Sequence, residues 1–222
     1  MRIRRKKHLN ERLGKLRDIL FTAGDFSPDL RQDVGEGCYF DFSVIFGNGN
    51  PVEMEIGCGK GGFIVQKAKD NPEVNFFAVE LLDNIVAMAG ELVVREGVSN
   101  VRLFNCGADY LRRYIKQNSV QAIYLNFSPP FNGKRYENRR LTKPALVSDY
   151  RGFLVEGGKI ELKTDDKEFF GYSAETLKNG GFKVEDLSEK LAAGETESVE
   201  TEYEKKFKEL GMPIYYLTAV KN

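Results

Sequence analysis

From Pro51 onward, the chain alternates between short apolar runs typical of β-strands and amphipathic stretches typical of helices. The strand-like runs are Val52–Ile56, Asn75–Val79, Val101–Phe104, Ala122–Phe127, Gly158–Leu162, Phe182–Leu187 and Ile214–Val220. The helix-like stretches are residues 61–70, 83–96, 108–117, 143–153 and 167–179. This alternation predicts a doubly wound, mostly parallel seven-stranded sheet of the α/β class. A long acidic insert without a clear crossover helix precedes the last run, which allows an antiparallel final strand.

Length and composition favour one domain preceded by a basic segment. We divide the chain into a basic N-terminal arm and lead-in, residues 1–50, and an α/β domain, residues 51–222. No apolar run reaches the roughly 18 residues of a membrane span, and no apolar stretch follows the basic N-terminus. Three scattered cysteines and a single histidine form neither a disulfide framework nor a metal site. We therefore expect a cytoplasmic protein without a metal, a membrane segment or a signal peptide.

Basic residues gather in two places on a chain whose net charge is zero. The first is residues 1–17, where Glu11 is the only acid. The second contains Lys134, Arg135, Arg139 and Arg140. Two basic clusters on a neutral protein favour contact with a polyanion such as nucleic acid. For either cluster alone, a solvated charged surface is the alternative.

A glycine-rich turn follows the first strand-like run and begins a helix. Glu55 ends the strand, Gly57 and Gly59 follow, and Glu80 ends the second strand. Glycines let a backbone approach a ligand closely, and an acid at the end of the second strand can accept hydrogen bonds from ribose hydroxyls. A carboxylate before the turn would repel a pyrophosphate but suits a ligand that carries a positive charge. The pattern therefore favours S-adenosyl-L-methionine over a dinucleotide as cofactor.

The third strand is followed by another acid, Asp109. In such folds an acid at this place commonly meets the adenine amino group of the ligand. Asp109 could equally be the N-cap of the helix that it precedes. Both roles stay open from the residues alone.

The fourth strand runs into a rigid polar turn, Ser128–Phe131, which contains two prolines. Proline fixes φ, so hydrogen-bond acceptors in the turn are held in place in advance. Open parallel sheets bind ligands at the carboxyl ends of their strands. We therefore expect Asn126, Ser128 and Pro129 to face the glycine turn at a catalytic site.

At these residues the chain resembles the bacterial tRNA (guanine-N7)-methyltransferases, and the resemblance covers nearly its whole length. The motifs that carry it are FGNGNP (46–51), EIGCGKG (55–61), NFS with KRxExRRLT (126–142), ELKTDD (161–166) and TEYEKKF (201–207). The resemblance implies a Rossmann-like methyltransferase fold, S-adenosyl-L-methionine as cofactor and tRNA as partner. It implies cofactor binding by Glu55 and Glu80, and a place at the substrate side for Asp165, Thr201, Glu202, Tyr203 and Glu204. We expect a monomer or homodimer.

Three positions depart from the family pattern. Pro129 stands where the family has its catalytic aspartate, Gly133 where it has a lysine that contacts the substrate, and Gly107 where it has a further acid that contacts the cofactor. A catalytically degenerate tRNA-binding paralogue is one alternative that these changes leave open. The other is an amino-group methyltransferase, because Ser128-Pro129-Pro130-Phe131 resembles the motif with which such enzymes hold an exocyclic amine.

Overall fold

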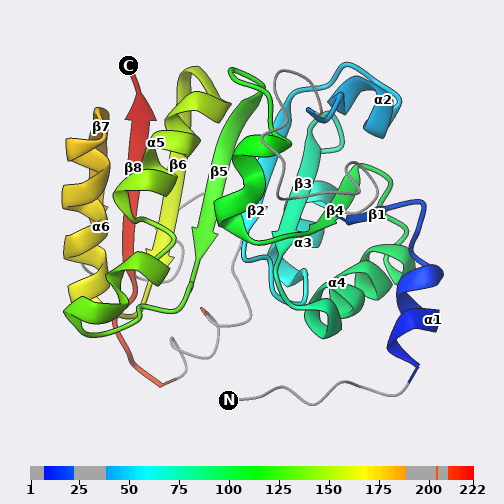
Figure 1. The fold of residues 1–222 in the computed structure, drawn as a ribbon, viewed down its shortest axis with the longest axis horizontal. Helices are drawn as coiled ribbons and strands as arrows, with labels where there is room; N and C mark the ends of the chain where they lie inside the picture. The colour runs from blue at the N-terminus through cyan, green and yellow to red at the C-terminus, as the bar shows by residue number, and fades with distance from the viewer. Residues whose placement is uncertain (1–7, 23–38, 189–203, 205–209) are drawn as a thin grey trace.

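The structure, a computed structural model, describes residues 8–22, 39–188, 204 and 210–222, and one eight-stranded sheet organises them (Figure 1). The strands are β1 (Leu20–Thr22), β2 (Val52–Ile56), β3 (Asn75–Glu80), β4 (Val101–Asn105), β5 (Val120–Asn126), β6 (Leu154–Thr164), β7 (Phe182–Ser188) and β8 (Tyr215–Lys221). Their order across the sheet is β1-β4-β3-β2-β5-β6-β8-β7. Neighbouring strands from β1 to β6 are parallel, whereas β8 is antiparallel to both β6 and β7.

The predicted α/β class, the mostly parallel sheet and the antiparallel last strand are confirmed, but the predicted strand count is wrong. The additional strand is β1, which pairs with β4 through Leu20 and Leu103. Its three residues are too few to show an apolar period in the sequence. The division of the chain at residue 50 stays a prediction, although the described lead-in packs on the sheet through β1 and the buried Phe40.

The α-helices are α1 (Leu9–Gly14), α2 (Phe42–Phe46), α3 (Gly62–Asp70), α4 (Asp83–Arg95), α5 (Pro144–Phe153) and α6 (Lys167–Asn179), and the 3-10 helices are η2 (Ala108–Arg113) and η3 (Lys134–Arg139). Helices α3, α4, α5 and α6 match the predicted stretches within one residue at each end. The α-helix predicted over residues 108–117 is wrong, because η2 is a 3-10 helix that ends at Arg113. Tyr114 then enters the core, where its ring lies 5.0 Å from that of Phe104.

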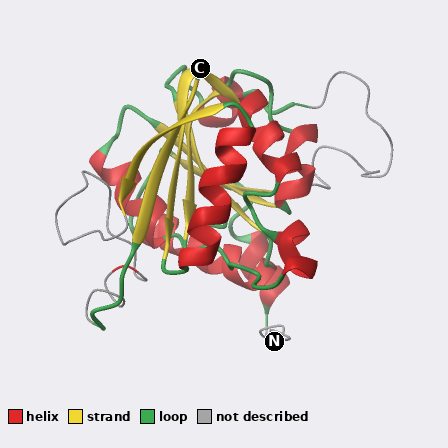
Figure 2. Cartoon of the chain, turned by 90° about the vertical axis from the view of Figure 1, so that its left-hand side faces the viewer, coloured by secondary structure: helices red, strands yellow, loops and turns green. Residues whose placement is uncertain are grey.

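Helices cover both faces of the sheet (Figure 2), and an apolar layer lies on each face. On one face, residues such as Met54 and Ile123 pack with side chains of α2, η2, α5 and α6. On the other, residues such as Phe76 and Leu103 pack with side chains of α1, α3 and α4. None of the helices in the described part of the chain is long and apolar enough to cross a membrane.

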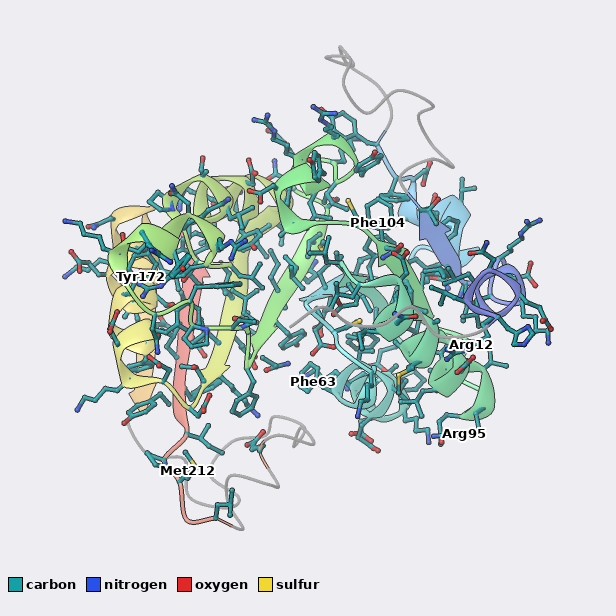
Figure 3. All side chains as sticks on the ribbon, turned by 60° about the horizontal axis from the view of Figure 1, so that its bottom comes forward. Arg12, Phe63, Arg95, Phe104, Tyr172 and Met212 are labelled. Carbon is teal, nitrogen blue, oxygen red and sulfur yellow. The ribbon has the colours of Figure 1, made fainter. Side chains whose placement is uncertain are left out.

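The topology reverses between β2 and β5. From β2 the chain proceeds outward through β3 to β4, and it then returns to place β5 on the other side of β2. Open α/β sheets bind ligands at such a switch point, at the carboxyl ends of the strands. That edge points downward in Figure 1 and comes forward in Figure 3.

Candidate active site

The glycine turn after β2 is shaped by backbone contacts to β3. The N–H groups of Gly57 and Cys58 both donate to the Val79 carbonyl, at 2.8 and 3.0 Å. Gly59 has a φ of 56°, a left-handed conformation that favours glycine. At Gly61 a β-carbon would come within 3.1 Å of the Ala89 β-carbon, so glycine also permits the close approach of α3 and α4. The turn therefore presents its backbone at the sheet edge, as the sequence predicted.

Glu55 is the buried acid of this edge. Its Oε1 accepts a hydrogen bond of 3.0 Å from Asn126 Nδ2, which joins the ends of β2 and β5 across the switch point. Its Oε2 is buried and has no hydrogen-bond partner among the described residues. Burial raises the pKa of Glu55 from 4.5 to about 8, the Asn126 hydrogen bond opposes this, and Glu80 adds to it. A ligand cation at Oε2 would satisfy this atom and return the carboxyl group to its charged form.

Glu80, at the end of β3, is fastened to the turn. Its Oε2 accepts from the Gly59 N–H at 3.1 Å, and its Oε1 accepts from the Leu82 N–H at 2.9 Å. Burial raises its pKa, and these backbone hydrogen bonds oppose the rise. The side chain is half-buried, so its carboxylate is fixed in direction while part of its surface stays accessible. This is the arrangement expected of an acid that receives two neighbouring hydroxyl groups.

Asp109 and Gly107 follow β4. Gly107 is the N-cap residue of η2, so the helix is not capped by Asp109. The Asp109 carboxylate instead forms an ion pair with Lys143, whose Nζ also donates to the Asn138 carbonyl at 3.0 Å. Asp109 thus ties the end of β4 to the segment after η3. A contact of Asp109 with adenine stays a prediction.

The turn after β5 has an unusual backbone. Phe127 and Phe131 have φ angles of 46° and 45°, which are uncommon for residues with a side chain. The Phe127 N–H donates to the Lys163 carbonyl of β6 at 2.8 Å. Ser128 is buried and its Oγ has no hydrogen-bond partner in the described part of the chain, whereas Pro129 is exposed. The structure therefore brings Asn126 to Glu55 and places a second buried polar atom, Ser128 Oγ, two residues further on.

The basic segment divides into exposed and buried members. Lys134, Arg135 and Arg139 are exposed on η3. The Arg135 guanidinium lies 4.4 Å from the ring centre of Tyr136, and that of Arg139 lies 5.7 Å from the ring centre of Phe131. Arginine beside half-buried aromatic rings suits an RNA surface, since both groups stack on bases.

The structure corrects the prediction for Arg140. This side chain is only 1% exposed and points into the protein, so in this structure it is not placed to contact phosphates. A run of adjacent arginines in a sequence does not reveal which of them points inward.

The substrate-side acids follow β6. Asp165 is half-buried directly after the strand. Asp166, which the sequence pattern did not single out, is the N-cap of α6 and accepts from the Phe169 N–H at 2.8 Å. It also accepts from Asn132 Nδ2 at 3.3 Å and so holds the loop before η3. Its side chain could have been recognised as a helix cap, because it directly precedes a helical pattern.

The last predicted substrate residues lie mostly outside the described part of the chain. Thr201, Glu202 and Tyr203 are among the residues that the structure does not describe. Glu204 is 2% exposed, and its Oε2 lies 2.9 Å from Lys163 Nζ. Its carboxylate therefore contacts β6 at Lys163, the residue whose carbonyl also accepts from the Phe127 N–H. A direct contact of Glu204 with substrate stays a prediction.

The geometry fits a cationic adenosyl cofactor better than a metal or a reactive thiol. Glu55 Oε2 offers a buried acceptor, and the Glu80 carboxylate is hydrogen-bonded to the glycine turn at Gly59. Among the described residues no group of three or more metal-ligand side chains gathers. Burial raises the pKa of Cys106 to about 11 and that of Cys58 well above its usual value, so neither thiol is a nucleophile near neutral pH.

Known proteins with similar sequences show the family of this chain. A family model described as "Putative methyltransferase" matches residues 49–217. A tRNA (guanine-N(7)-)-methyltransferase from Bacillus velezensis is 35% identical over 97% of this chain and 94% of its own length. Another from Geobacillus kaustophilus is 41% identical over 80% of this chain and 82% of its own.

Solved structures show the same fold at much lower identity. The 16S rRNA methyltransferase KamB superposes with a TM-score of 0.65 at 13% identity, covering 83% of this chain and 94% of its own. An antibiotic-related methyltransferase superposes with a TM-score of 0.60 at 16% identity, covering 82% of this chain and 92% of its own. With the sequence relatives, these likenesses identify the chain as an enzyme with the methyltransferase fold that belongs to the tRNA (guanine-N7)-methyltransferase family.

Proposed function

We propose that this protein transfers a methyl group from S-adenosyl-L-methionine to N7 of a guanosine in tRNA, in the cytoplasm. The observation that carries the proposal is the Glu55–Asn126 hydrogen bond at the switch point. It joins the buried acid of the glycine turn to the strand end that leads into the turn at Ser128–Phe131. The named activity of relatives that are 35–41% identical supports the same reaction.

The reaction depends more on the orientation of the cofactor and the base than on proton transfer. When bound, S-adenosyl-L-methionine supplies an electrophilic methyl group on a positively charged sulfur. Guanine N7 carries a lone pair and no proton, so a general base is not required to make it a nucleophile. Positioning alone can provide effective molarities of about 10⁵–10⁸ M. A proline at position 129 is therefore compatible with activity, although a carboxylate there would add a contact.

In this proposal, the glycine turn after β2 binds the cofactor and the end of β5 contacts the base. Glu55, Gly57, Gly59 and Glu80 hold the cofactor, with the ionised Glu55 carboxylate facing its positive charge. Asn126 keeps Glu55 in place, and the buried hydroxyl of Ser128 is available to a polar edge of the base.

The tRNA side consists of exposed basic residues and an acid. Lys134, Arg135 and Arg139 contact the RNA from η3, and Asp165 lies after the neighbouring strand β6. Cationic side chains that neutralise phosphates supply sequence-independent affinity. The aromatic rings of Phe131 and Tyr136, which lie beside these arginines, can stack on unpaired bases.

The test is to incubate unmodified tRNA with isotopically labelled S-adenosyl-L-methionine and to analyse the digested nucleosides. We expect label in 7-methylguanosine. Label on an exocyclic amino group would instead support the amino-group reading of Ser128-Pro129-Pro130-Phe131. Salt-dependent tRNA binding without incorporated label would support a degenerate paralogue. Either result would overturn the proposal.

A further inference from the structure

Arg140 is the buried end of an otherwise exposed basic segment. Its side chain is 1% exposed, and it ranks among the largest fully buried side chains of the described residues. Its neighbour Arg139 is exposed on η3. Burying a guanidinium is costly unless its donors are satisfied, so its contacts indicate what it does.

Three groups from two parts of the chain, the turn after β5 and α6, hold this guanidinium. Its Nε donates to the Pro130 carbonyl at 2.9 Å, and its Nη2 donates to Glu168 Oε1 at 3.0 Å. The guanidinium also lies over the ring of Tyr172, with 4.3 Å between Cζ and the ring centre. Tyr172 and Glu168 both come from α6, and Tyr172 is labelled there in Figure 3. Arg140 therefore connects the turn after β5 to α6.

The turn that Arg140 contacts requires outside support. Phe127, directly before the turn, and Phe131, its last residue, both have positive φ angles. Prolines 129 and 130 have no N–H groups with which to fasten it. One end is held by the hydrogen bond from the Phe127 N–H to the Lys163 carbonyl. Uncommon backbone conformations persist only where the surrounding structure imposes them, and Arg140 supplies such a restraint at Pro130.

We propose that Arg140 is a positioning residue for methyl transfer, which fixes the Ser128–Phe131 turn against α6, and that it does not contact RNA. The inference rests on the proposed function, because the turn matters for rate only if it lies beside the reacting base. An error of about 1 Å in the position of groups around a reaction can cost about 10²-fold in rate. The role thus predicts an effect on the catalytic step rather than on tRNA affinity.

The geometry requires arginine in particular. Nε and Nη2 donate in different directions from one planar group while its face lies on Tyr172. Lysine keeps the charge but offers neither the planar fork nor the stacking face. Arg140→Lys therefore separates this role from a phosphate contact, which a lysine would preserve.

The experiment compares Arg140→Lys and Arg140→Met with Arg139→Met as the matched control from the adjacent position. For the two Arg140 variants we expect kcat at saturating tRNA to fall about 10- to 100-fold. Their tRNA Kd and its salt dependence should stay within about threefold of wild type. Amide hydrogen exchange in the peptide that spans residues 124–133 should become faster. Arg139→Met should act mainly through KM and lower the salt slope by about 0.7–0.9.

Two results would overturn the inference: a weaker tRNA Kd with a smaller salt slope in Arg140→Met, or normal kcat in Arg140→Lys. If the Arg140 variants do not fold, Tyr172→Leu removes the supporting ring face while Tyr172→Phe retains it. We expect lower kcat for the first only, and equal rates would contradict the role. Wild-type protein that makes no 7-methylguanosine would refute the proposed function instead, whereas hydrogen exchange would still report whether Arg140 holds the turn.

Discussion

The two sides of the switch point differ in what holds them together. On the side of β2 and β3, the backbone itself builds the site: Gly57 and Cys58 donate to Val79, and Glu80 accepts from Gly59. On the side of β5 and β6, side chains from outside the turn brace an uncommon backbone, as Arg140 does at Pro130. The first arrangement tolerates few changes because the backbone of the turn itself makes the contacts. In the second arrangement, the residues of the turn after β5 can change while the contacts that hold the turn remain.

The departures from the family pattern fit this contrast. Pro129 and Gly133 both belong to the segment between β5 and η3, whereas the supporting contacts of Phe127 and Arg140 are present. On the cofactor side, Glu55 and Glu80 are retained and only the position of Gly107 differs. The comparison therefore predicts a normal cofactor site beside a modified substrate site.

Restoring an acid at the substrate site should produce the largest change. Pro129 is exposed at a turn whose neighbours Asn126 and Ser128 are in place, so Pro129→Asp can be accommodated. If the protein is a weakened guanine-N7 enzyme, its rate should rise toward the roughly 10²–10⁴-fold scale of a positioned acid or base. The measurement is single-turnover formation of 7-methylguanosine, with Pro129→Asn as the uncharged control. An unchanged rate in both variants would show that position 129 is remote from the reaction.

Glu80→Ala should give the next largest effect, on the cofactor side alone. A hydrogen bond to a charged group contributes about 1.5–3 kcal/mol, which corresponds to roughly a 10- to 150-fold loss of S-adenosyl-L-methionine affinity. Calorimetry of cofactor binding measures it directly. Glu91→Ala is the control, because Glu91 pairs with Arg12 on α1 rather than with the turn. Equal cofactor affinity in Glu80→Ala and wild type would remove Glu80 from the site.

The sequence predicted the geometry of the glycine turn better than that of the turn after β5, because its residues mark strand ends that the apolar pattern reveals. Glu55, the glycines and Glu80 form short patterns around strand ends, and the structure places them together. The direction of Arg140 depends on Tyr172 and Glu168, which lie about 30 residues away and cannot be inferred from local spacing. The burial of Lys163 with Glu204 is a similar case, since the two residues come from distant motifs. Short elements such as β1 escaped detection because their pattern is too brief.

The exposed arginines should have a smaller and more graded effect. Arg135 and Arg139 are exposed beside Tyr136 and Phe131. If each contacts one phosphate, changing both to alanine should lower the salt slope of tRNA binding by about 1.4–1.8, from roughly 0.7–0.9 per contact. Filter binding over a salt series provides the slope. Lys178→Ala, at the end of α6, removes one positive charge outside η3 and is a control with no expected effect. Parallel plots for wild type and double variant would exclude the RNA contact.

The smallest effect concerns the protonation of Glu55. Burial raises its pKa from 4.5 to about 8, so the folded protein favours the protonated form. The stability that this group contributes is therefore fully present below its unfolded pKa and is lost as pH rises through about 8. Without cofactor, the melting temperature of wild type should fall relative to that of Glu55→Gln across this window.

Near pH 7, binding of a positively charged cofactor should ionise Glu55 and release close to one proton. Calorimetry in buffers of different ionisation enthalpy measures the number of protons released on binding. Wild type should release close to one proton more than Glu55→Gln. If no proton is released, Glu55 is already charged in the free protein. The hydrogen bond from Asn126 across the switch point is then accepted by a carboxylate rather than by a carboxylic acid.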